Sequence, residues 1–234
     1  MASISQASFA ARIGRAQQLY QYINSFTGYT TDVPELMPAP FNDLITSLLA
    51  VQSEHTTTHH DFAEAAKNRR EFFTKSQNSI SKKLTLVNAY VRAKKGNTSQ
   101  QYIDVNTLVK KIRGEKPTKV TINSVVTTIS NSERSYGSQV QNLTNVVSLL
   151  EQYGTDYNPT NPNISLANLQ TIKDQATALN NDAAVKFAAY LPKIAARVST
   201  FKQLNETAIR IKGMVKSQFG NNSIEYNLVK GLLF

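Results

Sequence analysis

Residues 91–102 read VRAKKGNTSQQY and residues 215–226 read VKSQFGNNSIEY, so one pattern occurs twice at an offset of 124. Both segments place a glycine where a helix can end with positive φ, and a serine three residues later where the next helix can be capped. These matched residues are Gly96 and Gly220, and Ser99 and Ser223. The repeated element predicts that the chain contains one helical supersecondary unit twice.

The similarity continues upstream, where Ile4-Ser5 and Ile129-Ser130 each precede apolar residues spaced by three or four. The matched apolar residues are Phe9, Ile13, Ala16, Tyr20, Ile23 and Phe26 in the first copy, and Tyr136, Val140, Leu143, Val147, Leu150 and Tyr153 in the second. Prolines cluster at equivalent places, between 34 and 40 and between 159 and 162. We therefore divide the chain into copy one (1–116) and copy two (117–234).

In copy one, the apolar periodicity and the breakers predict four helices, a loop that contains Gly28 and Pro34 to Pro40, and a polar break. The expected helices cover residues 5–26, 41–73 and 82–95, and a short one runs from a cap at Ser99 to Gly114. The break falls at Thr74–Ser81, which is polar and poor in helix-forming residues.

In copy two, residues 115–124 are expected to be a polar, β-branched linker, and a helix is expected from Val125 or Ser132 to Tyr153. A loop at 154–163 then precedes a very long helix that opens at Ser165. Its apolar seam averages 3.5 residues per step and comprises Leu166, Leu169, Ile172, Ala176, Leu179, Ala183, Phe187, Tyr190, Ile194, Val198, Phe201, Leu204, Ala208, Ile211 and Val215. That period is typical of a left-handed helical bundle.

Two local features modify this long helix. Pro192 removes one backbone hydrogen bond, so we expect a kink near Ala188–Tyr190. Copy two is also four residues shorter than copy one at the polar stretch, because the offset changes from 128 to 124. We therefore expect the long helix of copy two to be continuous where copy one breaks.

These patterns predict an all-α fold, a long-helix bundle with a four-helix-like core built from two pseudo-symmetric helical hairpins. Each copy offers only two substantial helices, so packing the copies together as one domain buries their apolar faces better. The alternative is two separate helical domains joined at 115–124.

Several stretches resemble a family of uncharacterised bacterial proteins built from duplicated helical repeats. They are ISNSERSY (129–136), NLTNVVSLL (142–150), Tyr157-Asn-Pro159, Ala196-Arg197 and the repeated segment at 215–226. The resemblance implies a helical-repeat fold and brings neither an activity nor a catalytic residue with it.

Composition narrows the classes of function. The chain has no cysteine, which excludes disulfides and thiolate metal sites and suits a cytoplasmic protein. No signal peptide and no run of 18 apolar residues is visible, so we expect no integral membrane insertion. No phosphate-binding glycine loop or nucleophile elbow is present, so we expect no catalytic residue, no cofactor and no enzymatic activity.

The net charge of +10 is concentrated in residues 67–116, which hold 13 basic and three acidic residues. Residues that a phosphate-bearing partner would contact are Lys82, Lys83, Arg92, Lys94, Lys95, Lys110, Lys111, Arg113 and Lys116. Such a segment indicates either an ordinary solvated helix face or binding of nucleic acid, a membrane surface or an acidic protein. No known nucleic-acid-binding motif accompanies it.

His55 and His59 lie four residues apart on one expected helix face, a spacing that can hold a metal ion. They also belong to the apolar stripe of that helix, and their counterparts at an offset of 128 are Ala183 and Phe187. We therefore favour hydrogen-bonded bundle residues and keep a metal site as the weaker alternative.

The chain printed here ends with large apolar residues, Leu228, Leu232, Leu233 and Phe234, which either pack into the bundle or dock on another subunit. Together with the duplication and the long helices, they favour a non-enzymatic structural or scaffolding protein. It would act through protein–protein contacts, plausibly as a homo-oligomer. The alternative is an accessory protein that binds nucleic acid through residues 82–116.

Overall fold

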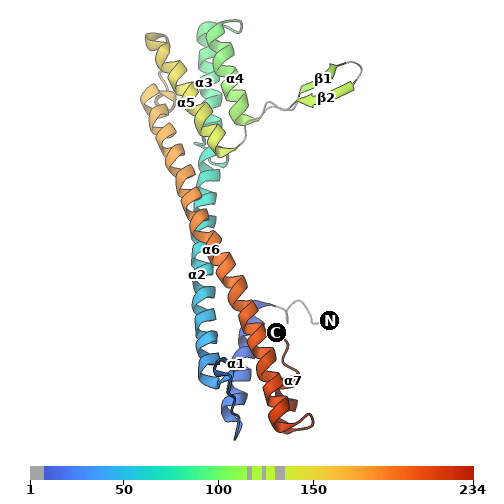
Figure 1. The fold of residues 1–234 in the computed structure, drawn as a ribbon. Helices are drawn as coiled ribbons and strands as arrows, with labels where there is room; N and C mark the ends of the chain where they lie inside the picture. The colour runs from blue at the N-terminus through green and yellow to red at the C-terminus, as the bar shows by residue number, and fades with distance from the viewer. Residues whose placement is uncertain (1–7, 115–117, 123–124, 130–134) are drawn as a thin grey trace. The chain divides into compact units, whose positions relative to one another are not determined.

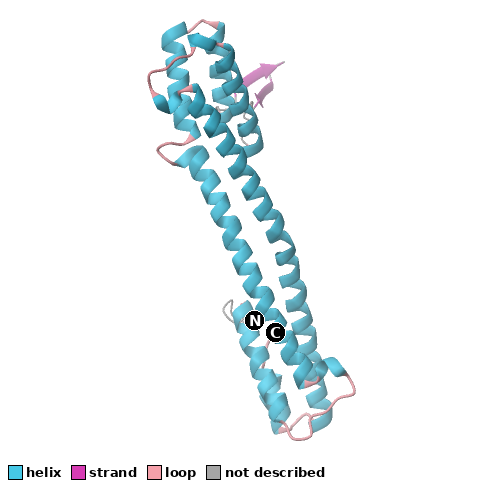
Figure 2. Cartoon of the chain, turned by 90° about the vertical axis from the view of Figure 1, so that its left-hand side faces the viewer, coloured by secondary structure: helices cyan, strands magenta, loops and turns pink. Residues whose placement is uncertain are grey.

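The computed structural model describes residues 8–114, 118–122, 125–129 and 135–234. Helices predominate, and one antiparallel pair of strands accompanies them (Figures 1 and 2). The first half contains α1 (Phe9–Ser25), η1 (Pro34–Leu36), α2 (Pro38–Arg70), η2 (Glu71–Lys75), α3 (Ile80–Lys95) and α4 (Gln100–Arg113). The second half contains β1 (Thr118–Ile122), β2 (Val125–Ile129), α5 (Tyr136–Gln152), η3 (Gly154–Asp156), η4 (Pro162–Ile164), α6 (Leu166–Phe219) and α7 (Ile224–Lys230). The predicted all-α class is therefore confirmed.

The helix ends follow the capping signals of the sequence. The hydroxyl of Ser99 accepts from the backbone N–H of Tyr102 at 3.2 Å, and that of Ser223 accepts from Tyr226 at 3.0 Å. The preceding glycines, Gly96 and Gly220, both have positive φ, at 86° and 95°. A residue with a side chain would be strained at such a φ, which explains why glycine ends both α3 and α6 at matched positions.

The expected difference between the two long helices is confirmed. After Arg70, α2 passes into one π-helical turn that contains Phe73, and α3 begins only at Ile80. In contrast, α6 continues without interruption from Leu166 to Phe219, with Pro192 inside it. The kink expected at Pro192 stays a prediction.

The segment that joins the copies differs from the prediction. Residues expected to be a linker include β1, and Val125, one of the two expected helix starts, begins β2 instead. The strands pair in antiparallel register from Thr118 opposite Ile129 to Ile122 opposite Val125. β-branched residues favour strands, which explains the pairing. The other expected starts, Ser132 in copy two and Ser5 in copy one, lie outside the described residues, and α5 begins at Tyr136.

The chain forms two compact units. Unit 1 consists of residues 1–61 and 188–234, and unit 2 of residues 62–187. Unit 1 therefore contains α1, the first part of α2, the last part of α6 and α7, while unit 2 contains the elements between. Each unit holds parts of both copies, because the long helices α2 and α6 contribute to both units.

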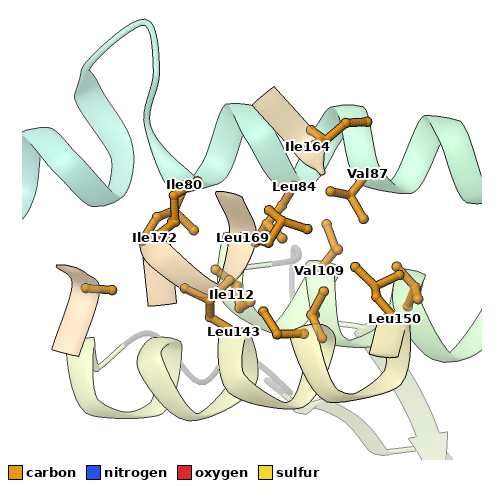
Figure 3. Packing of buried hydrophobic residues seen from close by; sticks show 14 of the residues in the cluster. Ile80, Leu84, Val87, Val109, Ile112, Leu143, Leu150, Ile164, Leu169 and Ile172 are labelled. Atoms are coloured by element: carbon orange, nitrogen blue, oxygen red, sulfur yellow. The ribbon is translucent and has the colours of Figure 1, made fainter. Parts of the chain in front are cut away.

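Each unit has its own apolar core. The core of unit 1 joins α1, α2, α6 and α7 and includes Leu19, Phe41, Leu48, Phe201, Ile211 and Val229. In unit 2, side chains from α3, α4, α5, η4 and α6 point toward one another (Figure 3). The residues labelled there are Ile80, Leu84, Val87, Val109, Ile112, Leu143, Leu150, Ile164, Leu169 and Ile172.

The apolar seam of α6 is buried in two stretches, from Leu169 to Ala183 (with Leu179 partly buried) and from Phe201 to Val215. Towards the middle the seam emerges: Phe187, Ile194 and Val198 are 43%, 37% and 59% exposed. The described part of the chain therefore leaves these three seam residues uncovered. None of the described helices has a stretch apolar and long enough to cross a membrane.

Candidate interaction surfaces

Matched tyrosines close matched loops in the two units. In unit 1, the hydroxyl of Tyr29 donates to the carbonyl oxygen of Leu36 at 3.0 Å. In unit 2, the hydroxyl of Tyr157 donates to the carbonyl oxygen of Ile164 at 2.6 Å, at an offset of 128 for both partners. Burial raises the pKa of Tyr29 to about 12 and also raises the pKa of Tyr157, because the ionised phenol would lose water.

Matched arginines stack on matched aromatic rings. The guanidinium of Arg197 lies 3.8 Å from the ring centroid of Phe9 in unit 1, and that of Arg69 lies 4.0 Å from the ring of Tyr136 in unit 2. The same two rings meet Phe201 and Phe73, with centroids 4.4 Å and 5.1 Å apart. Each contact joins residues of different copies within one unit. Stacking over a ring face stabilises a guanidinium without removing it fully from water.

His55 and His59 belong to α2, and their rings contact Tyr190 of α6 in unit 1. Nε2 of His55 is 3.2 Å from the hydroxyl of Tyr190 and 3.4 Å from Nη1 of Arg197. The rings of His59 and Tyr190 are 5.3 Å apart, and the matched pair in unit 2, Phe187 and Phe62, is 5.1 Å apart. Because a pair of phenylalanines does the same packing in unit 2, the contact of His59 has a structural explanation.

The electrostatics around His55 favour its neutral form. Burial lowers the pKa of its imidazole, and the nearby charges of Arg197 and His59 lower that pKa further. A metal ion at Nε2 would have to displace the Tyr190 hydroxyl and sit beside a guanidinium. Within the described residues, no group of three or more metal-binding side chains comes together. The geometry therefore fits the hydrogen-bonded interpretation of the pair better than the metal alternative.

The basic residues singled out from the sequence, except Lys116, lie on α3 and α4 of unit 2; Lys116 is outside the described residues. Lys95 forms an ion pair with Asp156 at 2.6 Å, and Lys82 donates to Gln77 at 2.9 Å. Lys94 lies 5.8 Å from the ring centroid of Tyr90. Nε of Arg92 donates to the side-chain oxygen of Asn97. The other basic residues named above are Lys83, Lys110, Lys111 and Arg113.

Two adjoining hollows lie between α3 and α4. The larger, of about 520 Å³, includes Asn88, Arg92, Asn97 and Tyr102 in its lining. The smaller, of about 350 Å³, shares Asn88 and adds Asn106, Lys110, Arg113 and others. Among the described residues, neither lining contains a carboxylate. The structure therefore places Arg92 in the lining of the larger hollow and Lys110 and Arg113 in that of the smaller, and we call the two adjoining hollows the α3–α4 groove.

The apolar C-terminal residues divide between core and surface. Leu232 is buried and Phe234 packs against the core of unit 1, whereas Leu228 and Leu233 are 43% and 51% exposed. Nζ of Lys212 donates to the carbonyl oxygens of Lys230 and Leu232, at 3.0 and 2.8 Å, and so holds this segment on α6. Ile224, one turn before Leu228 on α7, is 76% exposed.

A second apolar row, whose exposure the sequence did not predict, lies on α6 in unit 1. Leu191, Ile194 and Val198 are 48%, 37% and 59% exposed. Their spacing of three and four places them on one helix face. The spacing itself was visible in the sequence, but their exposure depends on which part of α6 the other helices of unit 1 cover.

The arginine–ring contacts were also missed, because they join the two copies and no local pattern marks them. The only sequence signal for these contacts is the repeat itself, in which Arg69 matches Arg197 and Phe9 matches Tyr136. The resemblance to duplicated helical-repeat proteins remains a prediction. Comparisons of the chain with protein-family models, with curated proteins and with solved structures found no match.

Proposed function

We propose that this chain is a duplicated helical-hairpin protein that works as a non-enzymatic structural component and associates with copies of itself. The matched tyrosine and arginine contacts of the two units support the duplication. Each tyrosine contact lies within one copy and each arginine contact joins the two copies, a pattern that two pseudo-symmetric hairpins would produce.

The observation that carries the proposed self-association is the exposed row on α6, Leu191, Ile194 and Val198. Ile194 and Val198 belong to a seam with the period of helix-to-helix packing, and Leu191 lies three residues before Ile194 on the same helix face. Unit 1 leaves all three uncovered. Seams of this kind are normally covered by another helix. A second copy offers the same row, so two copies can cover each other about a two-fold axis. The exposed residues of α7, Ile224 and Leu228, supply a second apolar row in the same unit.

The size of the row predicts weak, concentration-dependent association. Full burial of a large aliphatic side chain stabilises by about 1.5–3 kcal/mol, and these side chains are roughly half exposed, so each contributes about 1 kcal/mol. A two-fold contact counts each residue twice, for roughly 6 kcal/mol in all. Lost translational and rotational freedom opposes much of this gain. Association should therefore appear only at high protein concentration.

The test replaces the row by the residues that the repeat places at the matched positions of copy one, Ala63, Ala66 and Arg70. The variant carries Leu191→Ala, Ile194→Ala and Val198→Arg. We expect the wild type to sediment faster as its concentration rises, and the variant to remain a monomer with unchanged helix content. The variant should keep its fold because none of the three side chains is buried.

The matched control makes the reciprocal exchange in unit 2. Leu86 and Ile103 are 45% and 44% exposed, and their repeat partners are Arg210 and Asn227. The double variant Leu86→Arg, Ile103→Asn should associate like the wild type. A wild-type protein that stays monomeric at its solubility limit would refute the proposal, and so would association that survives the α6 exchange but not the control.

A further inference from the structure

The strongest unexplained feature is the charge of the helical pair α3–α4. Residues 80–113 contain eight lysines and arginines and one acidic residue, Asp104, which gives a net charge of +7. The matched segment, 204–234, contains four basic and two acidic residues, or +2. Both segments build the same kind of helix–turn–helix element, so the additional charge of α3–α4 is not needed for the fold.

The two elements also differ in what occupies the face between their helices. In unit 1, Lys212 matches Asn88, and its Nζ donates to the carbonyl oxygens of Lys230 and Leu232. Residues 230–232 therefore occupy this face in unit 1. In unit 2, Asn88 donates to the side-chain oxygen of Asn106 at 3.1 Å. The helix α4 continues beyond Asn106 to Arg113, which adds Lys110 and Arg113 to the groove.

We propose that the groove between α3 and α4 binds single-stranded nucleic acid through its phosphate backbone. Arg92 lines the larger hollow of this groove and Lys110 and Arg113 line the smaller, and no carboxylate is among the described lining residues. Guanidinium groups suit phosphate oxygens because they present several donors in one plane. The amides of Asn88, Asn97 and Asn106 add neutral donors to the same lining.

Shape favours a single strand over a duplex. From Thr85 to Gly96 the larger hollow follows α3 for 11 residues, which spans roughly 17 Å at the helical rise. A hollow of about 520 Å³ between two packed helices admits one extended strand, whereas a duplex would touch only its rim. Tyr102 lines the hollow and offers a ring on which a base can stack.

This inference goes beyond the proposed self-association and is tested apart from it. The experiment uses the full chain carrying Leu191→Ala, Ile194→Ala and Val198→Arg, and measures the fluorescence anisotropy of a labelled oligothymidylate. If the three basic residues neutralise three phosphates, the slope of log affinity against log salt concentration (the salt slope) should be about −2. Affinity should therefore fall about 15- to 20-fold between 50 and 200 mM salt. The background variant separates binding from association, because a failed self-association would leave this measurement intact.

The variant Arg92→Gln, Lys110→Gln, Arg113→Gln should lose at least about tenfold in affinity at low salt, and its salt slope should approach zero. A control of equal charge change, Lys202→Gln, Lys216→Gln, Lys230→Gln in unit 1, should bind within about twofold of the background protein, because these lysines lie outside the groove. Tyr102→Leu should weaken binding by about five-fold or more and leave the salt slope unchanged. Circular dichroism verifies that each variant keeps its helix content.

Three results would overturn the proposal. The first is no binding of oligothymidylate even at low salt. The second is equal loss of binding in the groove variant and in the unit 1 control, which would show that net charge alone is responsible. The third is tighter binding of a duplex, or equal binding of polyglutamate that depends on the same three residues, which would assign the groove to another class of partner.

Discussion

Units 1 and 2 share their internal contacts and differ in what they expose. Both close a loop with a tyrosine hydroxyl, and both stack an arginine on an aromatic ring. Outside, unit 1 exposes the apolar rows of α6 and α7, where the matched residues of unit 2 are Ala63, Ala66 and Arg70, and Gln100 and Asp104. The interior of a repeat is constrained by packing, whereas its surface is free to change.

Charge separates the units in the same way. Residues 62–187 hold 17 basic and nine acidic residues, a net charge of +8, while residues 1–61 and 188–234 together hold nine and seven, or +2. An excess of this size in one unit favours contact with anions there and leaves the other unit better suited to apolar association. The two units thus present chemically different surfaces.

The largest expected effect tests whether the cores are truly matched. Phe73→Ala and Phe201→Ala remove side chains that are 1% and 2% exposed, so each should destabilise its own unit by about 3–5 kcal/mol. Hydrogen exchange of amides in each unit measures this separately. Phe187→Ala, at a residue 43% exposed, serves as the control and should cost far less. A loss below about 1 kcal/mol for either buried ring would contradict the comparison.

The second-largest effect on stability is expected at the arginine–ring contacts. Arg69→Met and Arg197→Met keep much of the side-chain volume and remove the charge over the ring, which should cost about 1–2 kcal/mol each. Urea unfolding or hydrogen exchange provides the measurement. The exposed neighbour Arg70→Met should change stability by less than about 0.5 kcal/mol. Unequal losses of stability in the two variants would show that the two matched contacts, although alike in geometry, do not contribute equally to stability.

The tyrosine hydroxyls should contribute less to stability than the arginine–ring contacts. Tyr29→Phe and Tyr157→Phe each lose one hydrogen bond, at a cost of about 0.5–1.5 kcal/mol, with the larger loss at the more buried Tyr157. Alkaline titration adds a check on Tyr29, whose pKa rises from 10.0 to about 12. A raised folded-state pKa gives stability that is complete below pH 10 and is lost as pH rises towards 12. Absorbance of the phenolate should show Tyr29 ionising late, and Tyr29→Phe should abolish that late step.

The smallest expected effect distinguishes the units by pH, since all three histidines belong to unit 1. The pKa of His55 lies below its ordinary value of 6.5, so its contribution to stability is complete above pH 6.5 and declines as pH falls through the folded-state pKa. NMR titration should show that Arg197→Met raises the pKa of His55, because it removes a nearby positive charge. Arg69→Met in unit 2 should leave that titration unchanged.

Local features of the fold could be predicted from the sequence because local residues cause them. The cap at Ser99 and the positive φ of Gly96 depend on a few neighbours, and so does the break after Arg70. The start of α5 was missed because Val125 lies in a β-branched run that suits a strand as well as a helix, and the pairing with β1 decides between them.

The interaction surfaces were harder to predict, because they depend on which faces other helices cover. Charge counting identified Arg92, Lys110 and Arg113, but only the packing of α3 on α4 brings them to one groove. Similarly, periodicity marked Ile194 and Val198 as seam residues, and only the extent of the core of unit 1 shows that they remain exposed.

The order of folding during synthesis follows from the way the chain is divided between the units. Unit 2 is one uninterrupted stretch, residues 62–187, whereas unit 1 needs residues from both sides of it. Every residue of unit 2 is therefore synthesised before α7, and α1 must wait for its partners on α6 and α7 until the whole of unit 2 has been made. Unit 2 can begin to fold while unit 1 is still incomplete.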